Sequence, residues 1–213
     1  MSESTAASPW LAWARSLQAI SQTGLHFSRD VFDRERYTQI GAIVTEILGN
    51  YTNLTPDQVL QLNAGEFGYA TPKVDVRGAL IHAGKLLLVQ EALDRGRWTL
   101  PGGWADVNET PSQAVTRELY EETGYHSRAV KLVGVWDRET QGHTPNLPYT
   151  IYKLCFLCEL TGGAAQTSHE TGASAFFAAD ALPADLSISR VTPAQLARCF
   201  AHAADPTLPT EFD

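Results

Sequence analysis

Glu118, Glu121 and Glu122 are spaced so that an α-helix would bring them together. Glu121 and Glu122 follow Glu118 by three and four residues, and a helix that turns about 100° per residue places them on one face. Carboxylates that close repel one another, and a hard divalent cation with oxygen ligands would relieve the repulsion. The spacing therefore indicates a Mg2+ site, with Mn2+ as a substitute, whose remaining ligands are waters and substrate phosphates.

The residues around the glutamates predict the helix itself. Thr110 and Gln113 form a capping box, and proline suits the first helical position. Gly124 suits the end, so we expect a helix from about Pro111 to Thr123. The competing interpretation is a solvated acidic helix face, which is common among surface helices.

Other side chains would fix this helix in place. Val115 and Leu119 lie on the adjacent stripe and can anchor the helix to a sheet. Arg117 can pair with Glu109 across the corner between loop and helix. Gly103, in a Gly-Gly pair, permits close approach of a ligand to the backbone.

Residues 103–125, GWADVNETPSQAVTRELYEETGY, resemble a complete Nudix box. Every glycine and polar position of the pattern matches, and Tyr125 replaces the usual aliphatic residue at its end. The resemblance implies a Nudix α/β/α sandwich, an α/β fold. It also implies metal-dependent hydrolysis of the pyrophosphate bond in a nucleoside diphosphate linked to a group X, which gives a nucleoside monophosphate and X-phosphate.

The resemblance also implies roles for individual residues. The three glutamates would bind the metal, and Glu118 or Glu122 would activate the attacking water. Arg117 and Glu109 would orient the ligand helix, and the carbonyl of Gly103 is a further candidate ligand.

The first third of the chain predicts a helical module. Helices are expected from Pro9 to a stop at Gly24, from Asp30 to Asn50, and from Thr55 to Leu62. Their apolar stripes must be buried against the main domain or against a second copy of the chain, and we favour a homodimer. We assign residues 1–68 to this extension, at a dimer contact or the edge of the substrate pocket, and residues 69–213 to the hydrolase domain.

The rest of the chain alternates like strands around the Nudix helix. Residues 161–163 are expected to form a turn, and the residues after Asp205 are expected to be disordered. The expected strands are 74–82, 86–91, 98–100, 130–138, 150–160 and 175–177, followed by a last helix at 193–201.

Nearly the whole chain resembles a bacterial Nudix subfamily that includes CDP-choline pyrophosphatase and is often labelled ADP-ribose pyrophosphatase. The resemblance rests on residues 10–33, 68–77 (GYATPKVDVR), 98–106 (WTLPGGWAD), 152–160 and 186–190. The resemblance implies a dimer and a nucleoside diphosphate derivative as the substrate, of the ADP-ribose or CDP-choline type. Glu170 is a candidate extra metal ligand, with a solvated loop glutamate as the alternative. Arg77, Arg138 and Lys153 are candidates for phosphate contacts, and Trp98 for stacking on a base. Surface charge and core packing are the competing interpretations.

Composition excludes several other classes of function. The formal net charge of -8 does not suit nucleic-acid binding, so no specific nucleic-acid partner is expected. No signal peptide and no apolar run of about 18 residues is evident, so we expect a cytoplasmic protein without a membrane span. Cys155 and Cys158 would face opposite sides of a strand, which favours buried apolar cysteines over a zinc site. A non-catalytic Nudix ligand sensor and a hydrolase of RNA ends or 3′ nucleotides remain alternatives.

Overall fold

The computed structural model describes residues 9–63, 66, 68–166 and 171–213. The chain forms two compact units. Unit 1 comprises the chain up to Pro72 together with Asn146–Thr150, and unit 2 comprises Lys73–Pro145 and Ile151–Asp213. None of the helices in the described ranges combines the length and apolar character that crossing a lipid bilayer requires.

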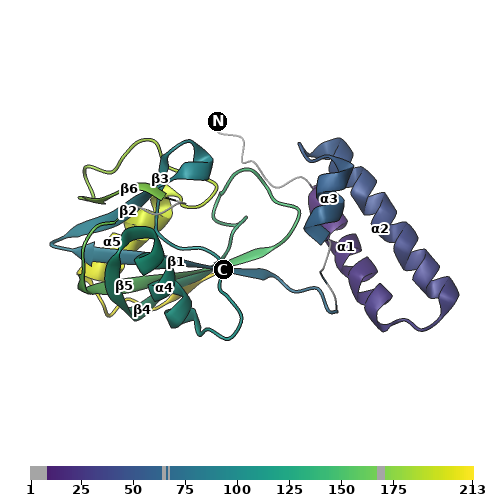
Figure 1. Cartoon of the computed structure of the whole chain (residues 1–213), viewed down its shortest axis with the longest axis horizontal. Coiled ribbons are helices and arrows are strands. Elements are labelled where there is room, and N and C mark those ends of the chain that lie inside the picture. The colour runs from purple at the N-terminus through teal and green to yellow at the C-terminus, as the bar shows by residue number, and fades with distance from the viewer. Residues whose placement is uncertain (1–8, 64–65, 67, 167–170) are drawn as a thin grey trace. The chain divides into compact units, whose positions relative to one another are not determined.

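Unit 1 is built from three helices, α1 (Pro9–Phe27), α2 (Val31–Tyr51) and α3 (Pro56–Asn63) (Figure 1). The side chain of Asp30 accepts hydrogen bonds from the amides that open α2, as the sequence predicts. The helices share a small core made of Leu11, Ala14, Val44, Leu48 and Val59.

The expected stop of α1 at Gly24 is wrong, because the helix continues to Phe27. A Cβ at Gly24 would overlap the ring of Tyr37, which lies on α2. The glycine therefore allows two helices to approach closely, and this tertiary contact outweighs its weak helix propensity.

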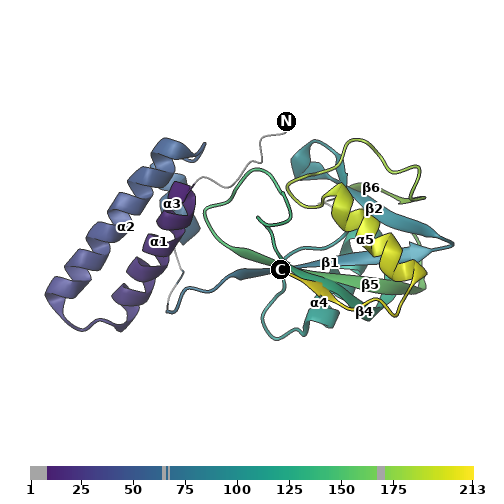
Figure 2. The ribbon, with the colours of Figure 1, turned by 180° about the vertical axis from the view of Figure 1, so that it is seen from behind.

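Unit 2 is a mixed β-sheet covered by one helix on each face. In Figure 1 the helix α4 (Pro111–Thr123) lies in front of the sheet, and in Figure 2 the helix α5 (Pro193–Ala204) lies in front of its other face. The strands are ordered β3-β2-β1-β5-β4-β7, with β6 paired to β2. Their bounds are β1 Lys73–His82, β2 Lys85–Glu91, β3 Arg97–Thr99, β4 Tyr125–Asp137, β5 Ile151–Gly163, β6 Thr171–Phe177 and β7 Glu211–Phe212. The Nudix α/β/α sandwich is confirmed.

Alternation along the strands divides the core into two layers. On β1, Val76 and Leu80 belong to the cluster that contains α4 residues, whereas Ala79 belongs to the cluster that contains α5 residues. On β5, Cys155 and Cys158 separate in the same way, and both are buried free thiols. The expectation of buried apolar cysteines on opposite faces of a strand is confirmed.

The C-terminus and the end of β5 differ from expectation. Residues 161–163 continue β5, so the predicted turn is wrong. The residues after Asp205 are ordered, since β7 pairs with β4 in parallel. The carboxylate of Asp213 accepts hydrogen bonds from the side chains of Thr140 and Gln141, at 2.7 and 2.8 Å. These partners lie more than 70 residues away in sequence, so local composition could not reveal them.

Candidate active site

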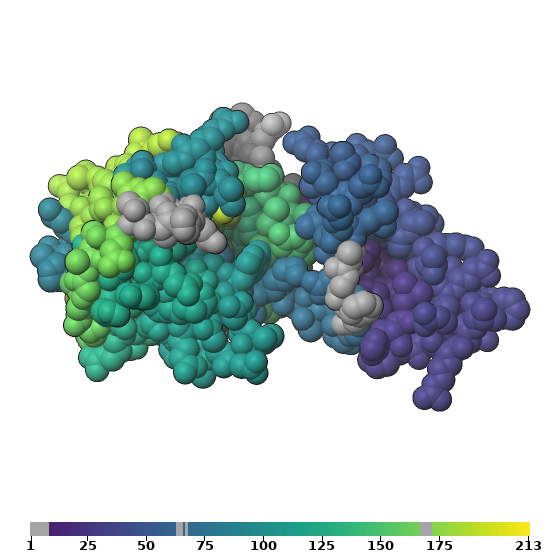
Figure 3. Space-filling view, in the orientation of Figure 1, coloured from purple at the N-terminus to yellow at the C-terminus, as the bar shows by residue number. Residues whose placement is uncertain are grey.

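The helix α4 presents the predicted glutamates and forms for the predicted reasons. The capping box between Thr110 and Gln113 is present in both directions, and Gly124 ends the helix with a φ of 74°. Val115 and Leu119 are buried against the sheet, as expected. Figure 3 shows this helix and the loop before it at the surface of unit 2.

Arg117 binds carboxylates on this helix and on the loop before it. Its Nε and Nη2 donate to the two oxygens of Glu109 at 2.8 and 3.0 Å, so the predicted pair is confirmed. Its Nη1 also donates to Glu118 and Glu121, at 2.9 Å each. The hydrogen bonds from Arg117 lower the pKa of Glu109. Arg117 therefore already offsets part of the repulsion among the carboxylates, a role that we expected a metal ion to fill alone.

Glu118 and Glu122 lie on the inner side of α4. Glu122 is 8% exposed, and its Oε2 accepts the amide hydrogen of Gly102 at 3.0 Å. Burial raises the pKa of Glu122 to about 8, although Arg77 and the Gly102 amide act against the shift. Burial also raises the pKa of Glu118. A buried and a partly buried carboxyl group, both with a raised pKa, indicate a place where an added cation would be stabilising.

The backbone of the loop Pro101–Gly103 lies against the carboxylates of Glu118 and Glu122. Gly102 has a φ of 138°, and a Cβ there would overlap the carbonyl oxygen of Val76. A Cβ at Gly103 would stand 2.9 Å from Oε2 of Glu118. The carbonyl of Gly103 accepts the Val76 amide at 2.8 Å, so one of its two lone pairs is used within the sheet.

The donor set fits a hard divalent cation, with fewer side-chain ligands than the sequence predicted. Glu121 is turned outward to Arg117, and its side chain is 56% exposed. Within the described residues, the structure gathers no group of three His, Cys, Asp or Glu side chains that could hold a metal. Two carboxylates beside a carbonyl are enough for Mg2+, which takes substrate phosphates and waters as its other ligands. Glu170 lies outside the described residues.

Two of the predicted phosphate-binding cations form a buried ion cluster instead. Arg77 donates to both oxygens of Asp75, at 2.9 and 2.6 Å, and Lys153 donates to Asp75 at 2.7 Å. All three residues are at most 6% exposed. Burial would raise the pKa of Asp75, but the two cations outweigh it and lower the value to about 2. Burial lowers the pKa of Lys153 to about 8.

The other two candidates for substrate contacts are also packed into unit 2. Arg138 is 3% exposed and donates to the carbonyl of Ser189. Trp98 packs edge-on against Phe177, with ring centroids 4.8 Å apart, and borders the main core cluster. The structure therefore supports the alternative interpretation for Trp98, which is core packing.

Sequence inspection missed two acidic residues of this region. Asp75 lies two residues before Arg77 on a strand, and this spacing on one strand face was a usable signal. Glu91 ends β2, is 7% exposed and pairs with Arg190 at 2.8 Å. No local pattern links Glu91 to Arg190, because 98 residues intervene between them.

His143 makes the stability of unit 2 depend on pH. Burial lowers the pKa of His143 to about 4, aided by Lys153, and its Nδ1 lies 2.9 Å from the carbonyl oxygen of Ile188. The unfolded chain protonates this imidazole near pH 6.5, so its contribution is complete above that pH and is lost as the pH falls toward 4. We expect this group to lower the free energy of unfolding by about 2 kcal/mol between pH 7.5 and pH 5.

Urea denaturation at both pH values measures this effect. His143→Gln keeps a donor for the Ile188 carbonyl and should shift the change in unfolding free energy between pH 7.5 and pH 5 by about 2 kcal/mol in favour of the variant at pH 5. The same change in the wild type and the variant would contradict the assignment to His143.

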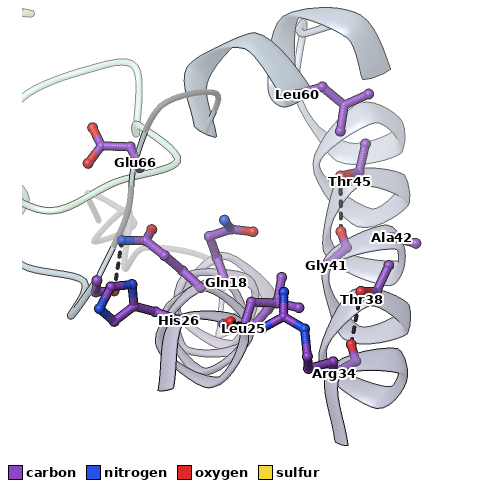
Figure 4. A pocket seen from close by; sticks show the side chains of 13 residues that line it. Gln18, Leu25, His26, Arg34, Thr38, Gly41, Ala42, Thr45, Leu60 and Glu66 are labelled. Atoms are coloured by element: carbon purple, nitrogen blue, oxygen red, sulfur yellow. Dashed lines mark hydrogen bonds between the residues drawn. The ribbon is translucent and has the colours of Figure 1, made fainter. Parts of the chain in front are cut away.

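A separate cavity of about 770 Å³ lies in unit 1 between α1 and α2. Gln18 and His26 line it from α1, and Arg34 and Thr38 line it from α2 (Figure 4). Glu66 is the one acidic side chain among the described residues that line it. This cavity lacks a carboxylate cluster, so the candidate catalytic site is the one in unit 2.

Comparison with known proteins agrees with the site. Residues 72–195 match the family model of the NUDIX domain, and residues 8–62 match the model described as a UDP-X-like, N-terminal oligomerisation domain. A Bacillus subtilis protein, YjhB, provisionally named as an ADP-ribose pyrophosphatase, is 40% identical over 96% of this chain and 97% of its own length.

Two solved structures are also similar. An ADP-ribose pyrophosphatase from Streptococcus suis is 38% identical with a TM-score of 0.60, covering 67% of this chain and all of its own. A UDP-X diphosphatase is 29% identical with a TM-score of 0.61, covering 96% of this chain and 98% of its own. Since the NUDIX model spans more than half of the sequence and YjhB matches nearly all of it, the chain belongs to the Nudix family of pyrophosphohydrolases.

Proposed function

We propose that this chain hydrolyses the pyrophosphate bond of a nucleoside diphosphate linked to X by using Mg2+ held at Glu118 and Glu122. The observation that carries the proposal is the pair formed on α4 by the buried Glu122 and the partly buried Glu118, next to the glycine loop whose amide holds Glu122. Acids that burial shifts to a raised pKa are typical of catalytic groups and metal ligands.

Each residue of the site has a defined task in this proposal. Mg2+, when held by Glu118 and Glu122, would neutralise the charge of the pyrophosphate. The carboxylate of Glu122 accepts a proton from the attacking water, since the Gly102 amide holds its Oε2 beside the proposed cation site. The Gly102 amide fixes the direction of that carboxylate. Arg117 is ion-paired with both Glu109 and Glu118, and it thereby fixes α4 relative to the loop before it.

Glu121 and Gly103 contribute less to the proposed metal site. Glu121 is exposed and ion-paired with Arg117, so it contributes negative charge at the rim rather than a buried ligand. The Gly103 carbonyl keeps a second lone pair that could face the cation. Mn2+, which also prefers oxygen ligands, should replace Mg2+.

The identity of X is a finer question. The names of the relatives support ADP-ribose and UDP-linked compounds, and the sequence resemblance adds CDP-choline. A panel of ADP-ribose, UDP-sugars, CDP-choline, NADH and nucleoside triphosphates, assayed with Mg2+ and with Mn2+, tests the proposal. Preference for one diphosphate-X compound supports it, and preferential release of nucleotides from a short RNA would overturn it.

We also propose that unit 1 forms a homodimer contact. Trp13, Ile20 and Phe27 recur every seventh residue along α1, a spacing that places them on one face. They are 66, 50 and 63% exposed, although large apolar side chains are usually covered. The match of residues 8–62 to an oligomerisation domain supports a second copy as the covering surface.

Light scattering coupled to size-exclusion chromatography tests the dimer. We expect the wild type to have twice the mass of one chain. The double variant Trp13→Glu/Phe27→Glu should elute as a monomer, because two charges would have to be buried at the contact. Val130→Glu, which alters an exposed apolar residue of β4, is the matched control and should stay dimeric. A monomeric wild type, or a double variant that remains dimeric, would contradict the proposal.

A further inference from the structure

The three basic side chains predicted for phosphate binding are all bonded to other groups in the interior of unit 2. Arg77 and Lys153 are bound to Asp75, and Arg138 is bound to the Ser189 carbonyl. Each is at most 6% exposed. A substrate that carries two phosphates needs a positive group that it can reach, and these side chains do not offer one.

Arg190 differs from them in exposure and bonding. Its side chain is 29% exposed, and its Nε lies 2.8 Å from Oε2 of Glu91. Within the described residues, the guanidinium of Arg190 makes no side-chain hydrogen bond, and its ion-pair partner is Glu91. The guanidinium is therefore held at one edge, and its two outer nitrogens remain as donors for a bidentate anion.

The backbone that carries Arg190 is fixed to the sheet. Trp98 of β3 donates to the Asp185 carbonyl at 2.9 Å and accepts from the Ser187 amide at 2.8 Å. A tight turn follows, in which the Arg190 amide donates to the Ser187 carbonyl at 2.8 Å. Such anchoring lowers the entropic cost of presenting a side chain to a ligand.

Glu91 connects Arg190 with the carboxylates of α4. The backbone of Glu91 lies opposite that of Arg97 where β2 pairs with β3, and the chain leaves β3 into the loop whose Gly102 amide holds Glu122. The charge of Glu91 is also among the causes that raise the pKa of Glu122, so the two carboxylates lie within electrostatic range. Its other oxygen accepts the Leu93 amide at 3.2 Å and caps the short helix η1 (Ala92–Asp94).

We propose that Arg190 binds the diphosphate of the substrate and that Glu91 is its positioning residue. This inference rests on the proposed function, because it assigns a substrate contact for that reaction. A guanidinium with two donors would bind the diphosphate in addition to a cation held by the α4 carboxylates, and would fix it for attack.

The test compares Arg190→Gln with the wild type in the full-length chain. We expect KM for the preferred substrate to rise roughly 10- to 100-fold, as for the loss of a charged hydrogen bond, with kcat little changed. Calorimetry with inorganic pyrophosphate and Mg2+ should show a similar loss of affinity without any need for turnover. Glu91→Gln, which keeps an acceptor for the Leu93 amide, should weaken pyrophosphate binding less.

Arg97→Gln is the matched control. Arg97 is an arginine of β3, 41% exposed in its side chain and ion-paired with Asp94 and Asp185, and its loss should leave KM and pyrophosphate affinity unchanged. If Arg190→Gln binds pyrophosphate within twofold of an active wild type, the inference is overturned and the proposed function stands. An inactive wild type would instead overturn the proposed function itself.

Discussion

Glu122→Gln should lower kcat by roughly 100- to 10,000-fold, the range typical of a lost general base. Glutamine keeps the shape of the side chain and an oxygen for the Gly102 amide, so the loop should stay in place. It removes the negative charge that would hold the cation and the basic oxygen that would accept the proton. Because burial already disfavours the ionised carboxylate, the substitution should not lower the thermal midpoint.

Steady-state kinetics with saturating Mg2+ and a thermal melt on the same samples measure both quantities. Glu159→Gln is the matched control, since Glu159 is a glutamate of β5, exposed and paired with Arg128 across the sheet. It should retain wild-type turnover. A Glu122→Gln variant that is folded and within threefold of wild-type kcat would show that the base lies elsewhere.

Asp75→Asn should have the largest effect on stability. The substitution leaves the buried side chains of Arg77 and Lys153 without their shared counter-charge. Removing one partner of a buried ion pair costs about 3–5 kcal/mol, because the remaining charge cannot be solvated. Urea denaturation at pH 7 should show this decrease in the free energy of unfolding.

Glu159→Gln again supplies the comparison. It breaks an ion pair whose side chains are 70 and 56% exposed, and such pairs contribute at most about 1 kcal/mol. Equal losses of unfolding free energy in the two variants would contradict the view that Asp75, Arg77 and Lys153 form a buried and strongly coupled ion cluster. The lowered pKa of Asp75 adds a pH signature, since its contribution is present above about pH 3.8 and is lost as the pH falls toward 2.

Local signals predicted the helix α4 well, and long-range contacts account for most of what the sequence did not reveal. The capping box and Gly124 lie within a few residues of the helix that they bound, so α4 was predicted to the residue. The cluster around Asp75 depends on the parallel pairing of β1 with β5, in which Asp75 lies opposite Lys153. No periodicity along one strand reveals which distant strand will be its neighbour.

Helical periodicity correctly placed the three glutamates of α4 on one face, but it did not predict the direction in which each side chain points. Glu118, Glu121 and Glu122 do lie on neighbouring turns of α4, yet Glu121 turns outward to Arg117 while Glu122 turns inward to Gly102. The choice between these directions depends on which partner lies beyond the helix. Spacing therefore identified the candidate ligands, and the partners decided which of them are buried.

The central proposal is that the carboxylates of α4 support metal-dependent cleavage between the two phosphorus atoms of a nucleoside diphosphate linked to X. The most direct measurement incubates the wild type with ADP-ribose and with a UDP-sugar, with Mg2+ or with excess EDTA, and identifies the products by mass spectrometry. We predict a nucleoside monophosphate and X-phosphate when Mg2+ is present, and intact substrate when it is chelated. Equal cleavage with EDTA, or no cleavage of any diphosphate-X compound by folded protein with Mg2+ or Mn2+, would contradict the proposal.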